Sequence, residues 1–163
     1  MSDLIARMGE KINHEESVYY WCWKNNIPVF CPAVTDGAVG DTLYYDTFRK
    51  AGLVIDIFKD LRKINDLALN AKKLGVIVLG GGVGKHHVMK AATYHGGADF
   101  SVIVNTAEEF DGSDSGARPD EAKSQGKIKK DATPVKVFSE ASIIWPILCG
   151  ATFATHEDLA RKV

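Results

Sequence analysis

The sequence predicts an α/β fold, in which helices cover both faces of a Rossmann-like parallel sheet of about five strands. Short apolar runs of strand length recur at fairly even intervals, and segments with helical patterns lie between them. This alternation is typical of parallel strands that are joined by right-handed helical crossovers. With 163 residues the chain has the length of one domain, and we expect a single domain over residues 1–163.

Five apolar runs are predicted to be strands. The middle three are rich in β-branched residues and nearly continuous in apolarity, as expected of strands that are buried on both faces. In chain order the five runs are Pro28–Cys31, Leu53–Ile57, Val76–Leu79, Phe100–Val104 and Val135–Phe138.

The clearest predicted helix is Phe58–Leu74, where apolar residues share one face and lysines lie mostly on the other. Residues 1–26 predict two helices, without the strand and glycine-rich turn with which a doubly wound fold usually begins. We therefore expect the chain to be the second part of something larger. Shorter helices are predicted at Ser17–Asn25, Asp41–Arg49, Lys85–His95, Asp120–Gly126 and Ala141–Phe153.

Composition and charge argue against several classes of protein. A formal net charge of −1 does not favour nucleic-acid binding driven by overall charge. The three cysteines are widely spaced, so neither a disulfide framework nor a metal site is predicted. The longest apolar run, Ile143–Cys149, is too short to cross a bilayer, and residues 1–16 mix acids and bases without the hydrophobic region expected of a signal peptide. We expect a cytoplasmic protein that binds neither nucleic acid nor membrane.

The most unusual segment is residues 105–127, NTAEEFDGSDSGARPDEAKSQGK. Its loop is rich in glycine, serine and carboxylates, which suits a ligand with several ammonium groups better than a core. Lys127, at its end, is a candidate amine nucleophile, although a solvated surface lysine is the simpler interpretation. Nearby carboxylates favour the protonated, unreactive amine, unless a cationic substrate neutralises them. Imine formation with a carbonyl-level substrate is then the expected chemistry.

A glycine-rich turn, LGGGVGK from Leu79 to Lys85, follows one predicted strand and precedes a helix. Glycines allow close backbone approach, and a helix N-terminus offers free amides to an anion, although a tight turn without a ligand is the alternative. Leu79 and His86 stand where a Walker A motif requires glycine and a hydroxyl residue. His86 and His87 open the helix, where histidine acts as a general base or, more often, lies at the surface.

Acids also follow two other predicted strands. Asp36 and Asp41 come after the first strand, and Glu140 comes after the last. Helix capping explains each of them singly, but it explains their accumulation at one edge of the sheet less well.

Together these segments resemble deoxyhypusine synthase. The FDGSDSGARPDEA string is highly specific, and the matching segments span nearly the whole chain in the family's order. They are HEESVYYW (14–21), PVFCPAVTDGAVGD (28–41), LGGGVGKHH (79–87), NTAEEFDGSDSGARPDEA (105–122), GKI (126–128) and PVKVF (134–138).

The resemblance implies a Rossmann-like enzyme that binds NAD and spermidine. NAD oxidises spermidine, and the aminobutyl group passes through an imine on an enzyme lysine to one lysine of the translation initiation factor 5A precursor. Because active sites of the family lie at subunit interfaces, the resemblance implies a homo-oligomer, a tetramer in the family, or a hetero-oligomer with a longer paralogue. A chain without neighbouring strands should also expose an apolar edge or face that favours association.

The resemblance also implies roles for individual residues. Lys127 matches the imine-forming lysine, and His86 matches the histidine near the oxidised carbon. Asp41, Asp114 and Glu121 match the polyamine-binding acids, with Gln125 beside them. The positions that match the NAD-binding residues are Asp36, Gly80, Gly81, Gly82, Thr106, Ala107, Asp111, Ser115, Glu140 and Ala141. Of these, Asp111 and Ser115 match residues that reach a neighbouring subunit's NAD.

Three departures from the family leave alternatives open. Gln125 stands where the family has a tryptophan that packs on the polyamine, and Glu140 replaces an aspartate. Family members are also about twice as long or longer, so we expect only the family's C-terminal portion here. One alternative is a non-catalytic or truncated paralogue that complements a full-length synthase. Another is an aminobutyltransferase similar to homospermidine synthase.

Overall fold

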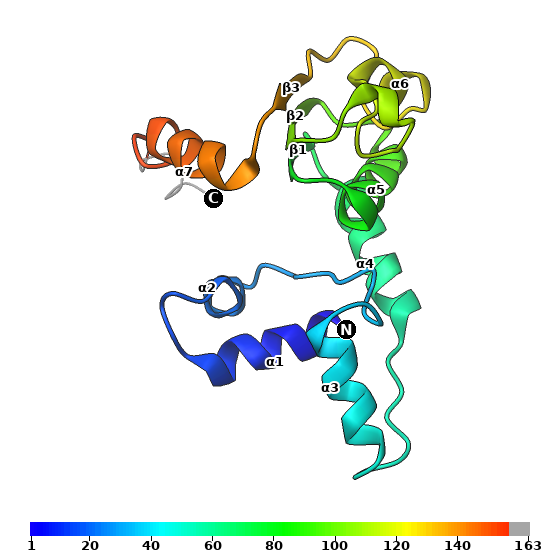
Figure 1. The fold of residues 1–163 in the computed structure, drawn as a ribbon, viewed down its shortest axis with the longest axis vertical. Helices are drawn as coiled ribbons and strands as arrows, with labels where there is room; N and C mark the ends of the chain where they lie inside the picture. The colour runs from blue at the N-terminus through cyan, green and yellow to red at the C-terminus, as the bar shows by residue number, and fades with distance from the viewer. Residues whose placement is uncertain (157–163) are drawn as a thin grey trace. The chain divides into compact units, whose positions relative to one another are not determined.

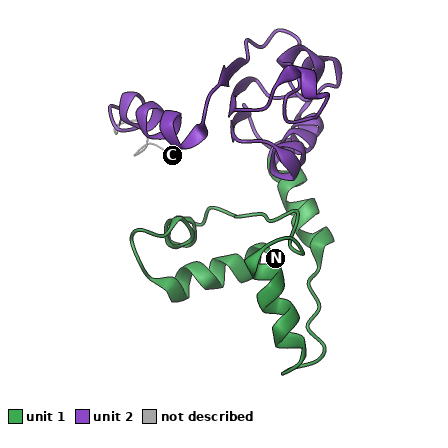
Figure 2. Cartoon of the chain, in the orientation of Figure 1, with its two compact units in different colours: residues 1–67 green, residues 68–163 purple. Residues whose placement is uncertain are grey.

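The computed structural model describes residues 1–156, which divide into two compact units with their boundary between residues 67 and 68 (Figures 1 and 2). The first unit is helical, and the second contains the sheet and the predicted acidic loop. Each unit is described by itself below.

Helices and irregular segments make up the first unit. Two helices at the start of the chain were predicted and are confirmed as α1 (Ser2–Ile12) and α2 (Val18–Lys24). They pack closely, because Gly9 of α1 lies against the backbone of Tyr19 in α2, where a side chain would clash. Two further helices are α3 (Ala38–Thr47) and α4 (Ile57–Leu69), which continues two residues past the boundary.

The prediction of five strands is wrong for two of the five. Residues 28–31 and 53–56 are irregular, and Ile57 already begins α4. Pro28 lacks an N–H group, and another proline, Pro32, follows the first run at once, so that run is poorly suited to a ladder. A run of four or five apolar residues cannot form a strand without a neighbour, and within residues 1–67 neither run has one.

The second unit is built on a parallel sheet. Its described strands are β1 (Gly75–Leu79), β2 (Phe100–Asn105) and β3 (Val135–Phe138), in the order β1-β2-β3. All pairs are parallel, as predicted. Helix α5 (Gly82–Ala92) and the short 3₁₀-helix η1 (Thr93–His95) connect β1 to β2. The 3₁₀-helix η2 (Glu109–Asp111) and α6 (Pro119–Ser124) lie between β2 and β3, and α7 (Ala141–Ala151) follows β3.

One face of the sheet carries the core of this unit. Val76 and Val78 of β1 and Ile103 of β2 pack against Met89 and Ala92 of α5, together with Ala98 and Ile128. Helices on both faces were predicted, but β1 alternates between exposed and buried residues, so only one of its faces is covered. The apolar residues of its other face, Ile77 and Leu79, are exposed.

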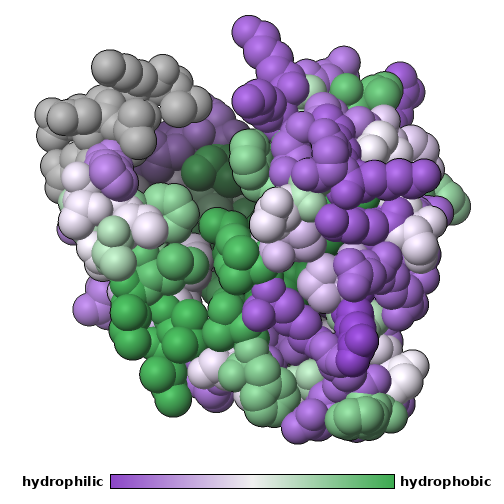
Figure 3. Space-filling model, turned by 90° about the horizontal axis from the view of Figure 1, so that it is seen from above, coloured by the Kyte–Doolittle hydropathy of each residue, from purple (hydrophilic) through white to green (hydrophobic). Residues whose placement is uncertain are grey.

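Apolar side chains reach the surface elsewhere too, and Figure 3 shows a cluster of apolar residues on the face that it draws. In α7, for example, Ile143 and Ile147 are exposed. The helices of the described part of the chain are each too short or too polar to span a bilayer.

A charged cluster fastens the amino end of the sheet. The Asp99 carboxylate accepts hydrogen bonds from the Leu74 backbone N–H (2.8 Å) and from Lys129 Nζ (2.7 Å), and it contacts His95 Nε2 at 3.1 Å. Leu74 precedes β1, Lys129 follows Ile128, and His95 is the last residue of η1. The Asp99 carboxylate therefore joins three segments of the chain. The Leu74 backbone bond, followed by the Lys129 bond, holds the pKa of Asp99 well below its usual range despite the opposing effect of desolvation.

We therefore predict that Asp99→Asn lowers the free energy of unfolding at neutral pH, because the neutral amide loses the ion pair with Lys129. Since the pKa of Asp99 is lower in the folded state, its contribution is fully present above the unfolded pKa of about 4 and is lost as the pH falls through the folded pKa. Urea unfolding at several pH values should show the difference between wild type and variant shrinking below about pH 4.

The exposed Asp131→Asn is the matched control, and it should change stability by no more than about 0.5 kcal/mol. A difference between wild type and Asp99→Asn that stays constant down to pH 2 would contradict the role of this carboxylate.

Candidate functional site

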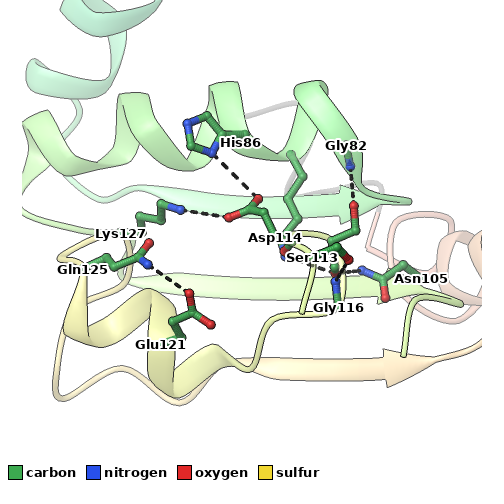
Figure 4. A network of polar contacts seen from close by, with 11 residues as sticks. Gly82, His86, Asn105, Ser113, Asp114, Gly116, Glu121, Gln125 and Lys127 are labelled. Atoms are coloured by element: carbon green, nitrogen blue, oxygen red, sulfur yellow. Dashed lines mark hydrogen bonds and ion pairs between the residues drawn. The ribbon is translucent and has the colours of Figure 1, made fainter. Parts of the chain in front are cut away.

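The Asp114 carboxylate lies between two candidate catalytic side chains (Figure 4). Its Oδ1 atom accepts a hydrogen bond from Lys127 Nζ at 3.2 Å, and its Oδ2 atom lies 3.8 Å from His86 Nδ1. Lys127 is only 9% exposed, so the solvated position that is usual for a surface lysine does not apply to it. An amine, an imidazole and a carboxylate are therefore in contact in one place.

Lys127 reaches this place from the end of the sheet that lies opposite the glycine turn. The residue after it, Ile128, is buried in the core and forms a parallel bridge with Ala98, just before β2. The Lys127 carbonyl accepts from Ala98 N at 3.0 Å. Gly97 makes this close approach feasible, since a Cβ there would lie 2.7 Å from Lys129 N. The backbone of Lys127 is thus held by a core residue, while its side chain runs toward Asp114.

The loop that carries Asp114 is anchored on the start of α5. Ser115 Oγ accepts from the Gly82 N–H at 2.7 Å and so caps a helix whose own N-cap residue, Gly81, has no side chain. A Cβ on Gly81 would lie 2.6 Å from Ser115 Cβ, so glycine is required there by the approach of the loop. The glycine turn thus serves the acidic loop directly.

A buried asparagine joins the same loop to the sheet. Asn105, the last residue of β2, donates from Nδ2 to the backbone oxygens of Ser115 (3.0 Å) and Gly80 (3.3 Å). Its Oδ1 accepts from Ala107 N at 3.3 Å. One amide therefore connects the ends of two strands with the acidic loop.

The charge of Asp114 depends on the balance between burial and nearby cations. Partial burial raises the pKa of its carboxyl group, but the hydrogen bond and charge of Lys127, with the charges of Lys85 and His86, outweigh burial and leave the pKa below its usual value. Burial lowers the pKa of Lys85, although the charge of Asp114 opposes this. Asp114 is therefore an anion at neutral pH and is surrounded by cationic groups.

The remaining members of the site lie on and after α6. Glu121 and Gln125 line a narrow pocket together with Lys85, Asp114 and Lys127. Gln125 Nε2 donates to Glu121 Oε1 at 3.0 Å, so the glutamine occupies one oxygen of this acid. The volume of the pocket, about 10 Å³, is enough for about one water molecule.

Several other predicted site residues lie at exposed or half-buried positions. Asp36 and Asp41 are exposed residues of the first unit. Asp111 is exposed on η2, and Thr106 is exposed directly after β2. The NAD-binding roles of these residues and of half-buried Ala107 stay predictions, as does polyamine binding by Asp41.

Glu140 is engaged as a helix cap. Its carboxylate accepts hydrogen bonds from the hydroxyl and the backbone N–H of Ser142, which lower its pKa, and Ala141 is the first residue of α7. Capping was the simpler interpretation of this acid, and the contacts bear it out. The predicted NAD-binding role of Glu140 and Ala141 stays a prediction.

Sequence reasoning missed two residues of the site, Lys85 and Asn105. Lys85 stood in the glycine-rich motif, where it served only to test for a Walker A pattern. Asn105 stood directly after a predicted strand, at the edge where polar residues of α/β sheets meet ligands. A polar residue at the end of an apolar run was the signal that could have identified it.

Groups of three or more histidine, cysteine or acidic side chains with the geometry of a metal site do not occur among residues 1–156. The fold and the site together define an α/β protein whose described residues form a parallel sheet of three strands, with a carboxylate that lies between a lysine and a histidine.

Comparison with known proteins identifies the family. The sequence profile of deoxyhypusine synthase matches residues 1–152. The chain therefore belongs to the deoxyhypusine synthase family.

Curated relatives of the chain carry the same name. A "Probable deoxyhypusine synthase" of Dictyostelium discoideum is 61% identical over 153 residues, which are 94% of this chain and 41% of that protein. One of Drosophila melanogaster, with the same name, is 57% identical over 161 residues, 99% of this chain and 44% of that protein. The deoxyhypusine synthase of Neurospora crassa is 55% identical over 160 residues, 97% of this chain and 45% of that protein. The chain thus spans less than half the length of these relatives.

A solved structure is similar as well. It is a crystal structure of an Entamoeba histolytica protein that is provisionally assigned to deoxyhypusine synthase, with a TM-score of 0.71 and 39% sequence identity. The match covers 94% of this chain and 46% of that one.

We predict that Asn105→Ala lowers the free energy of unfolding by about 1–3 kcal/mol, because it leaves partly buried groups of Gly80, Ser115 and Ala107 without this partner. Urea unfolding followed by circular dichroism measures the change. Thr106→Ala, at the neighbouring exposed position, is the matched control and should stay within about 0.5 kcal/mol of wild type. Equal effects of the two substitutions would contradict the role of Asn105 as a connector.

Proposed function

We propose that this chain carries the imine-forming lysine and the polyamine-binding acids of the deoxyhypusine synthase reaction. In that reaction the aminobutyl group of spermidine is transferred to a lysine of the translation initiation factor 5A precursor. The observation that carries the proposal is the contact of the buried Lys127 amine with Asp114, whose other oxygen faces His86. Family membership supports the proposal, and the retained lysine, histidine and acids give it a chemical basis.

Asp114 explains how the lysine could change its role. In the absence of substrate its carboxylate accepts a hydrogen bond from the Lys127 amine. An amine that keeps its proton is not a nucleophile. A polyamine ammonium that binds Asp114 and Glu121 competes for the same oxygens and so weakens the hold on Lys127. The neutral amine then attacks the oxidised carbon of the polyamine, and an imine forms with loss of the amine that carbon carried. His86, beside Asp114, is placed to accept or return a proton.

The residues at the glycine turn fit a dinucleotide. A Cβ at Gly80, Gly82 or Gly84 would meet no atom within 4 Å, so the backbone there is open to a ligand. Gly80 and Gly82 have positive φ angles of 90° and 65°, which only glycine adopts readily. NAD, when bound, supplies the oxidation of the polyamine and the later reduction of the product imine. In this proposal Gly80, Gly81, Gly82, Thr106 and Ala107 hold NAD.

Because the pocket is small, we propose that it widens when substrate binds or that another polypeptide segment completes the site. A polyamine does not fit into room for about one water molecule. Oligomer formation, which the exposed apolar residues of β1 favour, supplies such a completion in this proposal.

The test is to trap the lysine adduct. We expect that incubation with NAD and labelled spermidine, followed by borohydride reduction, attaches label to Lys127, as located by peptide mass spectrometry. Lys127→Ala should abolish the adduct. Lys130→Ala, which removes a nearby exposed lysine, should retain it. Absence of both label and spermidine cleavage in wild type would refute autonomous catalysis. Product analysis with putrescine as acceptor would reveal an activity similar to homospermidine synthase.

A second candidate function is complementation of a longer synthase subunit by a non-catalytic chain. It is favoured by Gln125, which occupies an oxygen of Glu121. Mixing with a full-length family member should then give a stable hetero-oligomer in sedimentation experiments and raise its activity. Sedimentation of the two proteins as separate species would exclude this function.

A further inference from the structure

Lys85 is a buried cation. Neither the glycine-rich motif nor the proposed reaction assigns it a role. It lies one turn into α5, is only 7% exposed and lies beside the reactive lysine in the wall of the same pocket. Burying a lysine is unfavourable unless its amine is well bonded. Its bonding partners therefore indicate what it does.

The partners of Lys85 are backbone oxygens of the acidic loop. Its Nζ donates to the carbonyls of Asp114 and Ser115, the second at 3.2 Å. The Asp114 side chain is not a hydrogen-bond partner in either contact, since its two oxygens face Lys127 and His86. Lys85 thus holds the peptide from which the carboxylate projects and leaves that carboxylate available.

Gly82, Asn105 and Lys85 each donate hydrogen bonds to the segment formed by Asp114 and Ser115. Gly82 N binds the Ser115 hydroxyl, and Asn105 shares the Ser115 carbonyl with Lys85. Among these three, Lys85 alone contacts the Asp114 residue itself. Glycines and serines on both sides of Asp114 give the loop little stiffness of its own, so the direction of the carboxylate depends on this contact.

We propose that Lys85 is a positioning residue, whose buried amine holds the Asp114 backbone so that the carboxylate lies between Lys127 and His86. This inference rests on the proposed function, because it concerns the residue that controls the proposed imine-forming lysine. Lys85 itself does not touch the substrate in this role. Its amine is engaged by two carbonyls, which distinguishes it from Lys127.

The first test measures Lys127 without any substrate. Limited acylation with acetic anhydride, read by peptide mass spectrometry, gives the labelling rate of Lys127 relative to exposed Lys130. In Lys85→Met the carboxylate should leave Lys127, and the relative rate should rise about tenfold. Lys85→Arg, which keeps donors for the two carbonyls, should restore much of the wild-type rate. Lys90→Met removes an exposed charge from the same helix and should change nothing.

A double-mutant cycle separates positioning from a general effect on the fold. If Lys85 acts through Asp114, adding Lys85→Met to Asp114→Asn should change the Lys127 labelling rate less than twofold. An unchanged rate in a folded Lys85→Met protein, or additive effects in the double mutant, would overturn the proposal. If Lys85→Met does not fold, Lys85→Gln takes its place with the same outcomes, and circular dichroism reports the folded state.

Equilibrium dialysis with labelled spermidine then tests whether the position of the Asp114 carboxylate affects polyamine binding. Lys85→Met should weaken binding about tenfold, with recovery in Lys85→Arg. If wild type binds no spermidine while the labelling cycle behaves as expected, the proposed function fails and the positioning by Lys85 stands. If wild type binds spermidine and Lys85→Met binds it equally well, the positioning role fails and the proposed function stands.

Discussion

The site depends on one constraint: a carboxylate must stay charged and in place on a loop that has little rigidity of its own. Asp114 is partly buried, which by itself disfavours its anion. Nearby cations reverse that preference, and side chains from α5 and β2 hold the backbone of the loop. If the carboxylate were displaced, Lys127 would remain at the edge of the pocket without its partner.

The sheet supports this constraint through its two ends. At the carboxyl end, Asn105 and the glycine turn receive the loop. At the amino end, the bridge between Ala98 and Ile128 fixes the backbone beside Lys127, and Asp99 fastens the connections around that bridge. Because β2 runs between these ends, the relative position of lysine and carboxylate depends on the length and register of one central strand. That explains how residues 13 positions apart in the chain meet across the pocket.

Much of the second unit could be predicted from its sequence. The apolar runs that became β1 and β2 are rich in β-branched residues, and β1, β2 and β3 each lie next to another strand. The runs at residues 28–31 and 53–56 are also largely apolar but have no partner strand within residues 1–67, and a pattern of four or five residues does not reveal whether one exists. Coverage of both sheet faces was likewise inferred from the apolarity of Ile77 and Leu79, yet apolarity shows only that burial is favourable.

The sequence by itself identified the family and most chemical groups of the site, since the FDGSDSGARPDEA string and the glycine turn are local and specific. Only the tertiary structure decided which groups meet. It buried Lys85, turned Ser115 into the cap of α5, and paired Lys127 with Asp114 while Glu121 took Gln125. The reason is physical: the identity of a side chain is local information, whereas its partner depends on strand register and on the desolvation of groups distant in the chain.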